Sequence, residues 1–461
     1  MPRRRVARLR PATVIVLVVL SVAVAVAGTL LAVPGWRAAV LPATNVTTSA
    51  APPVGWRAPE TAPPAPLPLD ELATSPAPAA RALLAAMPKL AKDAAATPGV
   101  VVVDPSTGKT LIGRGDKPVL PASTMKVLTG LVALDTLPAE ATFRTAVVSP
   151  RRGVLVLRGG GDPLLSDARA SGRASLQQLA DATAKELKAA GIRKVSLGYD
   201  ATLFTGRGWH AHWTDNYRYS VAPISALMIG GGRSPRDGRA QKNPAASAAG
   251  AFAARLAKAG ITVGTPKPAK ASDGATELAA VASPSVQQLV EHTLRYSDNV
   301  AAEALARHVG LATRQRGDFA GAYAAVRDRL RALGLWATGM VIDDSSGLSR
   351  DNRVTPGVLA AAMRLVLSQD RLRPLIAGLP VGGVTGTLAD RFTDRAAWAG
   401  RGIVRAKTGS LRDVSTLAGY LVTAQGAPLV FALTANKVRL PNRTRQWMDR
   451  TTAAWAACGC P

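Results

Sequence analysis

A long apolar segment near the start of the chain constrains where the remainder can fold. Low-polarity residues run without a break from Ala12 to Val33, and a group of arginines precedes them: Arg3, Arg4, Arg5, Arg8 and Arg10. At about 1.5 Å per residue, a helix of this length crosses a hydrocarbon layer of about 30 Å. Because positive charge stays on the cytoplasmic side, we expect residues 1–34 to be a transmembrane anchor and the rest to fold outside the cytoplasm. A cleaved signal peptide, with the weak pattern Ala23-Val24-Ala25, is the alternative.

Residues 35–77 have the composition of a linker. They are rich in Pro and Ala, with prolines at Pro52, Pro53, Pro59, Pro63, Pro64, Pro66 and Pro68. Such a sequence favours an extended, semi-rigid spacer. We expect folded structure to begin near Pro78, with a first helix over Ala79–Lys92.

Charge distribution and cysteine content argue against a nucleic-acid-binding protein and against a disulfide-rich protein. The formal net charge is +27, but the arginines are scattered through an Ala-rich sequence and do not alternate with aromatic residues along a stripe. In an exported chain this indicates a solvated basic surface, and we expect no nucleic-acid partner. Two cysteines alone, Cys458 and Cys460, provide no disulfide framework, and their spacing assigns them no role.

Strand and helix patterns predict an α+β fold. Hairpin strands are expected at Gly99–Val103 and Thr110–Arg114, and late strands at Ile403–Ala406, Leu417–Val422 and Leu429–Ala435. Helices are expected at about Ser123–Leu137, Val286–Leu294, Val300–His308, Pro356–Val366 and Asn442–Ala457. Because strands at both ends enclose helices, we expect one antiparallel sheet completed by both ends of the folded part and flanked by helices, an α/β/α sandwich.

The tetrapeptide Ser123-Thr124-Met125-Lys126 opens the first long helix after Pro121. A spacing of three residues puts the serine hydroxyl and the lysine amine on one helical face. A buried lysine near another cation has a lowered pKa and can take the proton of the serine. The motif therefore predicts a serine nucleophile with a lysine base, although alone it also suits an exposed helix start.

Two further motifs follow in the same order as in known serine acyltransferases. Tyr296-Ser297-Asp298-Asn299 lies between two expected helices and suits either a loop that presents Ser297 and Asn299 to a cleft or an ordinary Asx-type cap. Lys407-Thr408-Gly409-Ser410 follows the short strand expected at Ile403–Ala406, where Gly409 allows a substrate backbone to approach. Together with Ser123 and Lys126 these motifs match the signature of penicillin-binding proteins and β-lactamases.

The chain resembles the low-molecular-mass class C penicillin-binding proteins, the D-alanyl-D-alanine carboxypeptidase/endopeptidase family of the serine β-lactamase/DD-peptidase superfamily. The long segment between Ser123 and Ser297 is similar to the family's habit of inserting a domain there. We expect a DD-peptidase domain from residues 78–144 and 284–461, with one inserted domain at 145–283. Further similar stretches are Gly159-Gly160-Gly161-Asp162-Pro163-Leu164, Asp344-Ser345-Ser346-Gly347-Leu348-Ser349-Arg350, and Gly386-Thr387-Leu388.

The resemblance implies a function and a role for each motif residue. It implies a serine carboxypeptidase/endopeptidase of the cell envelope that cleaves D-alanyl-D-alanine in peptidoglycan peptides and is acylated by β-lactams. The implied catalytic residues are Ser123 as nucleophile, Lys126 as base and Ser297 as proton relay. The implied substrate-binding residues are Asn299, Lys407, Thr408, Gly409 and Ser410, with an oxyanion hole from the backbone N–H groups of Ser123 and Ser410.

Two alternatives and one expected absence accompany this prediction. A serine β-lactamase shares the motifs, but Glu303 is the one glutamate between Asn299 and Lys407 and lacks an E-x-x-x-N pattern, so we expect slow penicillin turnover. A catalytically silent envelope scaffold is the alternative of another class. The histidines His210, His212, His292 and His308 form no HExxH motif, and the chemistry requires neither a metal nor another cofactor.

Overall fold

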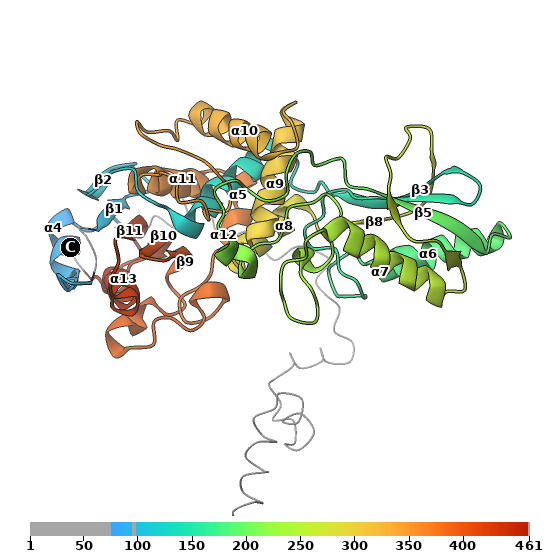
Figure 1. Ribbon diagram of the computed structural model, residues 1–461. Coiled ribbons are helices and arrows are strands. Elements are labelled where there is room, and N and C mark those ends of the chain that lie inside the picture. The colour runs from blue at the N-terminus through green and yellow to red at the C-terminus, as the bar shows by residue number, and fades with distance from the viewer. Residues whose placement is uncertain (1–74, 95–97, 460–461) are drawn as a thin grey trace, which may run out of the picture. The chain divides into compact units, whose positions relative to one another are not determined.

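The computed structural model describes residues 75–94 and 98–459 (Figure 1). The predicted anchor, residues 1–34, and nearly all of the predicted spacer, residues 35–77, lie outside the described residues. Within residues 75–94 and 98–459, no helix has both the length and the apolar character that crossing a membrane requires.

The first sheet is built from both ends of the described chain. Its strands are β1 (Gly99–Val103), β2 (Thr110–Arg114), β9 (Arg405–Leu411), β10 (Val414–Val422) and β11 (Pro428–Asn436), in the order β2-β1-β11-β10-β9. All neighbours are antiparallel, and Val101 of β1 lies opposite Ala432 of β11. This confirms the predicted antiparallel sheet and its completion by both ends of the folded part.

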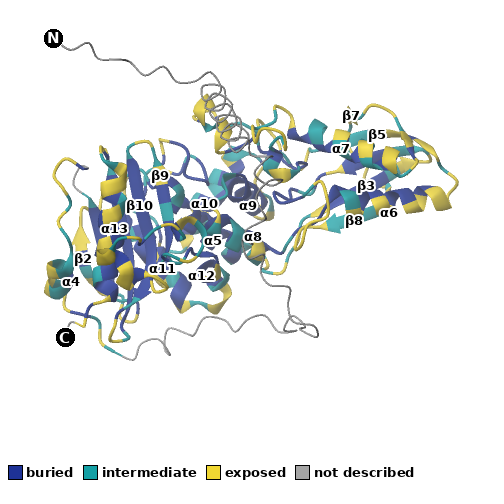
Figure 2. Ribbon diagram, turned by 90° about the horizontal axis from the view of Figure 1, so that it is seen from below, coloured by how far each residue is buried: buried dark blue, intermediate teal, exposed yellow. Residues whose placement is uncertain are grey.

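Alternation of side chains explains why helices cover both faces of this sheet. Val101 and Val103 enter one core, whereas Val100 and Val102 enter a second core on the opposite face. The first core also contains residues of α5 (Met125–Thr136), α8 (Val286–Arg295), α9 (Asn299–Ala312), α10 (Phe319–Ala332), α11 (Pro356–Ser368) and α12 (Pro374–Gly378). The second contains residues of α4 (Ala80–Ala86) and α13 (Pro441–Ala456), and Figure 2 shows buried strands beside helices with exposed faces. The predicted α/β/α sandwich is confirmed.

Residues 144–282 carry a second, mixed sheet. Its order is β6-β5-β4-β3-β8, formed by β3 (Arg144–Arg151), β4 (Val154–Arg158), β5 (Lys194–Asp200), β6 (Thr262–Val263) and β8 (Thr276–Ala282), while β7 (Lys267–Pro268) also pairs with β5. The helices α6 (Leu176–Ala189) and α7 (Pro244–Lys258) pack with strand residues such as Leu155 and Leu197 in one core. This part of the chain therefore has its own hydrophobic core.

One stretch between β5 and α7, residues 204–228, packs mostly in a different core, and we call it the connecting segment. Its Trp213, Ile224 and Met228 share a core with Val300 of α9 and with Leu348. Apolar burial thus fixes the connecting segment against α9 and against the loop that contains Leu348.

Two expected elements differ from the structure by more than a shift of a few residues at one end. The first helix ends at Ala86 and not at Lys92, because Met87 is extended, as residues that precede a proline prefer, and Pro88 follows. The motif Lys407–Ser410 does not follow a short strand but lies within β9, where Lys407 pairs with Ala418 of β10. Pairing with β10 continues through Gly409 to Leu411, and this tertiary contact extends the strand beyond the short apolar run.

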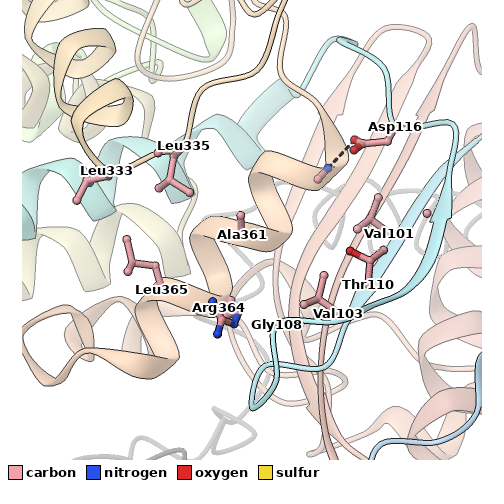
Figure 3. A pocket seen from close by; sticks show the side chains of 13 residues that line it. Val101, Val103, Gly108, Thr110, Asp116, Leu333, Leu335, Ala361, Arg364 and Leu365 are labelled. Carbon is pink, nitrogen blue, oxygen red and sulfur yellow. Dashed lines mark hydrogen bonds between the residues drawn. The ribbon is translucent and has the colours of Figure 1, made fainter.

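The first hairpin and α11 enclose a small pocket (Figure 3) of about 350 Å³. The backbone N–H of Gly357, near the start of α11, donates to Asp116 Oδ1 at 2.7 Å, and Arg364 reaches across toward Gly108. None of the predicted site residues lines this pocket. It therefore belongs to the attachment of α11 to the hairpin.

Trp455 offers a test of how the second core joins the ends of the chain. Its side chain is fully buried, its ring lies 6.1 Å from that of Phe431, and its Nε1 donates to the carbonyl of Leu83 at 3.0 Å. We expect Trp455→Ala to lower the free energy of unfolding by about 3–5 kcal/mol, through the cavity and the lost hydrogen bond, as measured by urea denaturation. The control Trp398→Ala removes a tryptophan that is 57% exposed and should change it by less than about 0.5 kcal/mol. Equal losses in the two variants would contradict this role of Trp455.

Candidate active site

Ser123 lies in the short 3-10 turn Ala122–Thr124, which leads directly into α5. The carbonyl of Pro121 accepts hydrogen bonds from Thr124 Oγ1 at 2.6 Å and from Thr416 Oγ1 at 2.8 Å. Ala122 takes a left-handed backbone conformation with φ of 47°. A bent chain held by two threonines thus positions Ser123 at the start of the helix.

Lys126 is fully buried, and its amine has three partners from separate parts of the chain. Nζ lies 3.1 Å from Ser123 Oγ, 2.6 Å from Asn299 Oδ1 and 2.6 Å from the carbonyl oxygen of Ser346. Burial lowers the pKa of Lys126 to about 8, while the negative charges of Asp344, Glu303 and Asp298 act in the opposite direction. The protonated and neutral forms of the amine are therefore equal near pH 8, far below the usual range of lysine.

The loop between α8 and α9 contains Ser297, Asp298 and Asn299. The sequence left open whether this loop caps a helix or presents side chains to a cleft, and the structure shows that it does both. Asp298 caps α9, accepting the N–H of Ala301 at 3.0 Å, whereas Ser297 has φ of 57° and Asn299 is the first residue of the helix. The hydroxyl of Ser297 accepts a hydrogen bond from Lys407 Nζ at 3.0 Å. The loop is at once a helix cap and a support for two polar side chains that face the lysines.

Lys407, like Lys126, is fully buried, and it comes from β9. Besides Ser297 it donates to the carbonyl of Thr408 at 2.7 Å. Burial holds the pKa of Lys407 well below its ordinary value, and the charge of Lys126 lowers it further. The two lysines therefore disfavour each other's charge, and a nearby anion would favour a charged Lys407.

Strand β9 passes very close to the turn that carries Ser123. A Cβ on Gly409 would lie 2.0 Å from Thr416 Oγ1, 2.8 Å from the Pro121 carbonyl and 3.1 Å from the Ser123 nitrogen, so only glycine fits. Thr408 Oγ1 lies 2.7 Å from Thr387 Oγ1, and Ser410 is exposed on the same strand. The predicted residues of all three motifs are thus brought to one place on the first sheet.

Several groups that support the site residues had no predicted role. Two of them, Asp344 and Thr387, lie in stretches of the sequence that are similar to the family. The carboxylate of Asp344 accepts the N–H groups of Gly347 at 2.7 Å and Ser349 at 2.6 Å, and so shapes the loop whose Ser346 carbonyl contacts Lys126. Thr387 also had no predicted role, and its hydroxyl is hydrogen-bonded to that of Thr408. A backbone carbonyl such as that of Ser346 has no sequence signature at all.

Glu303 also holds the loop that contains Ser346, through hydrogen bonds from backbone N–H groups. It is buried in α9, and its Oε1 accepts the N–H groups of Ser345 at 3.0 Å and Ser346 at 2.7 Å. Burial, assisted by the charge of Asp344, raises the pKa of Glu303 to about 8. The Oε1 atom of Glu303 is occupied by two backbone hydrogen bonds, so this glutamate has a structural role and is not positioned as a base for water.

Comparison with known proteins finds one matching family model and related carboxypeptidases. The family model described as D-Ala-D-Ala carboxypeptidase 3 (S13) matches residues 81–237 and 234–456. A carboxypeptidase of Mycobacterium tuberculosis is 37% identical over 404 residues, which cover 83% of this chain and 84% of the relative. The carboxypeptidase DacB of Mycolicibacterium smegmatis is 35% identical over 424 residues, 87% of this chain and 89% of the relative.

The solved structures agree on the fold. The crystal structure of penicillin binding protein 4 from Haemophilus influenzae aligns with a TM-score of 0.67 at 22% identity, covering 81% of this chain and 98% of that protein. The resemblance read from the motifs and the predicted enzyme class, a serine-type D-alanyl-D-alanine carboxypeptidase, are confirmed. The chain belongs to the D-Ala-D-Ala carboxypeptidase 3 (S13) family.

Proposed function

We propose that this carboxypeptidase cleaves D-alanyl-D-alanine in peptidoglycan peptides, with endopeptidase action on cross-links, through an acyl-enzyme on Ser123, and that β-lactams acylate the same serine. The observation that carries the proposal is the environment of the Lys126 amine. Two of its three partners, Asn299 Oδ1 and the Ser346 carbonyl, can only accept hydrogen bonds. A neutral amine has two N–H groups for these acceptors and one lone pair left for the proton of Ser123.

The first half-reaction follows from this arrangement. Ser123 Oγ bonds to the carbonyl carbon between the two D-alanines as Lys126 takes its proton. The C–N bond then breaks, the electron pair stays on nitrogen, and the proton that Lys126 took is relayed through Ser297 to the leaving amine, so that Lys126 is neutral again. Ser297 suits this role because its hydroxyl is hydrogen-bonded to Lys407 at 3.0 Å. Water hydrolyses the ester in the second half-reaction and restores Ser123.

Substrate is held by the strand and the loop beside the nucleophile. Asn299 orients both Lys126 and the substrate, and Thr408 and Ser410 receive the terminal carboxylate on β9. Arrival of this carboxylate favours the charged form of the buried Lys407 and so offsets the cost of its burial. The backbone N–H groups of Ser123 and Ser410 form the oxyanion hole. The lack of room for a Cβ on Gly409, which would lie 3.1 Å from the Ser123 nitrogen, supports the close approach of the two segments.

The family implies an extracytoplasmic location in the cell envelope. We further propose that residues 1–34 anchor the chain in the membrane, that residues 35–77 are a spacer, and that residues 145–283 are a domain inserted between residues 78–144 and 284–461. The separate core of the second sheet supports this division.

Replacement of the nucleophile tests the central assignment. We expect the wild-type protein to gain one penicillin mass in intact-protein mass spectrometry, and Ser123→Ala to gain none, because the Ser123 hydroxyl lies 3.1 Å from the amine proposed as its base. The matched control is Ser106→Ala, an exposed serine in the β1–β2 turn, which should label like the wild type. An adduct on folded Ser123→Ala would refute the assignment. No adduct on folded wild-type protein, with the penicillin intact, would instead favour the silent scaffold.

The pH dependence of acylation tests the base. Because the pKa of Lys126 is lowered to about 8, its neutral form increases as the pH rises toward 8. The acylation rate constant should therefore rise by close to about tenfold per pH unit below this value and level off above it, as measured with a fluorescent penicillin. Lys126→Ala should lose both the rate and this profile, whereas exposed Lys185→Ala should keep them. An unchanged profile in Lys126→Ala would exclude Lys126 as the base.

Deacylation separates the peptidase from the β-lactamase alternative. Because Glu303 is bound to the N–H groups of Ser345 and Ser346, no dedicated glutamate base is expected to activate water. We expect the penicilloyl adduct to accumulate to one per chain while the penicillin in solution remains largely intact. Rapid, multiple-turnover hydrolysis of penicillin would support the β-lactamase.

A further inference from the structure

Two histidines of the connecting segment meet two aspartates at the loop that supports Lys126. His212 Nδ1 lies 2.8 Å from Asp343 Oδ2 and 3.0 Å from Asp351 Oδ2, and His210 Nδ1 lies 3.8 Å from the same oxygen of Asp343. One potential ligand atom from each of His210, His212 and Asp343 lies within 4.8 Å of the others. The cluster is distinct from the three motifs of the active site.

The composition and spacing of this cluster match a transition-metal site. Imidazole nitrogen and carboxylate oxygen are ligands of Zn²⁺, with bonds of about 2.0–2.2 Å. Tetrahedral bonds of this length put neighbouring ligand atoms about 3.3 Å apart. The distances of 2.8, 3.0 and 3.8 Å lie on both sides of that value, so small side-chain movements suffice.

We propose that His210, His212 and Asp343 bind a divalent ion of the zinc class, with Asp351 or a water molecule as fourth ligand. The sequence alone predicted no metal because its histidines lack HExxH spacing. In this cluster the two histidines are separated by one residue, and the carboxylates belong to Asp343 and Asp351, more than a hundred residues later in the chain.

Neighbouring groups already orient the proposed ligands. Ser349 Oγ donates to Asp343 Oδ2 at 2.5 Å, and the backbone N–H of Asp343 donates to Asn352 Oδ1 at 2.8 Å. The largely buried ring of His210 packs edge-on against Phe319, with centroids 4.7 Å apart. Its Nδ1 accepts the N–H of His212 at 3.2 Å, a bond that an ion at this nitrogen replaces. Such outer contacts tune metal affinity.

The position of the site indicates what the ion does. It joins the connecting segment to the loop that Asp344 shapes, next to the hydrogen bond from Trp213 Nε1 to Asp344 Oδ2 at 2.8 Å. The connecting segment also supplies the Ser220 carbonyl, which accepts from Asn299 Nδ2 at 2.8 Å. The ion therefore acts as a clamp beside the active site and takes no part in the bond-breaking steps.

The test is calorimetric titration of ZnCl₂ into the full chain, purified without a histidine tag and stripped of metal. We expect one ion per wild-type chain, and affinity at least about tenfold weaker in His212→Ala. The matched control is Asp215→Asn, which changes an exposed carboxylate of the same segment that is outside the cluster, and which should bind zinc within about twofold of wild type. Because His212 is 53% exposed, its replacement is expected to leave the fold intact.

A second measurement keeps the result interpretable. Zinc should raise the melting temperature of wild type and Asp215→Asn but not of His212→Ala, and metal-free His212→Ala should still be labelled by penicillin, which shows that it is folded. The absence of a stoichiometric zinc ion in the wild type would overturn the proposal. Equal zinc affinity in wild type and His212→Ala would also overturn it, since the cluster would then be a hydrogen-bonded histidine–aspartate group and any ion would lie elsewhere.

Discussion

The buried amine of Lys126 sets the main constraint on this structure. An ammonium or amine without partners in a protein interior is strongly destabilising, so its acceptors must be in place when the chain folds. Those acceptors come from the turn before α5, from the start of α9 and from the loop at Ser346. Three segments that are far apart in the sequence therefore have to converge on one nitrogen atom.

The surrounding fold satisfies this constraint with rigid elements. Apolar contacts of α5 with α8, α9 and α11 bury the helix that carries Lys126, and the sheet beneath brings β9 against the preceding turn. Asp344 and Glu303 fix the loop of Ser346 through backbone N–H groups, so the carbonyl that faces Lys126 is held from two sides. Most of the residues around Lys126 therefore serve to hold its three partners in position.

Local features and the fold class were predictable from the sequence, whereas individual contacts between distant segments were not. The contact of Ser123 with Lys126 follows from their spacing within one helical turn, and Gly409 signals a close backbone approach. The order of the motifs, together with the family resemblance, was sufficient to predict the fold class. The Ser346 carbonyl was not predictable, because every residue has a carbonyl and only the folded loop aims this one at Lys126. The meeting of His212 with Asp343 likewise depends on packing between distant segments.

The hydrogen bond from Asn299 to the Ser220 carbonyl has a consequence for how separable the parts of the chain are. Residue 220 belongs to the stretch between the two halves of the first sheet, yet its backbone completes the hydrogen bonding of a side chain that contacts Lys126. Excising that stretch would deprive Asn299 of this acceptor. The backbone of this stretch is therefore part of the support around Lys126, and the stretch cannot be removed without changing the surroundings of that amine.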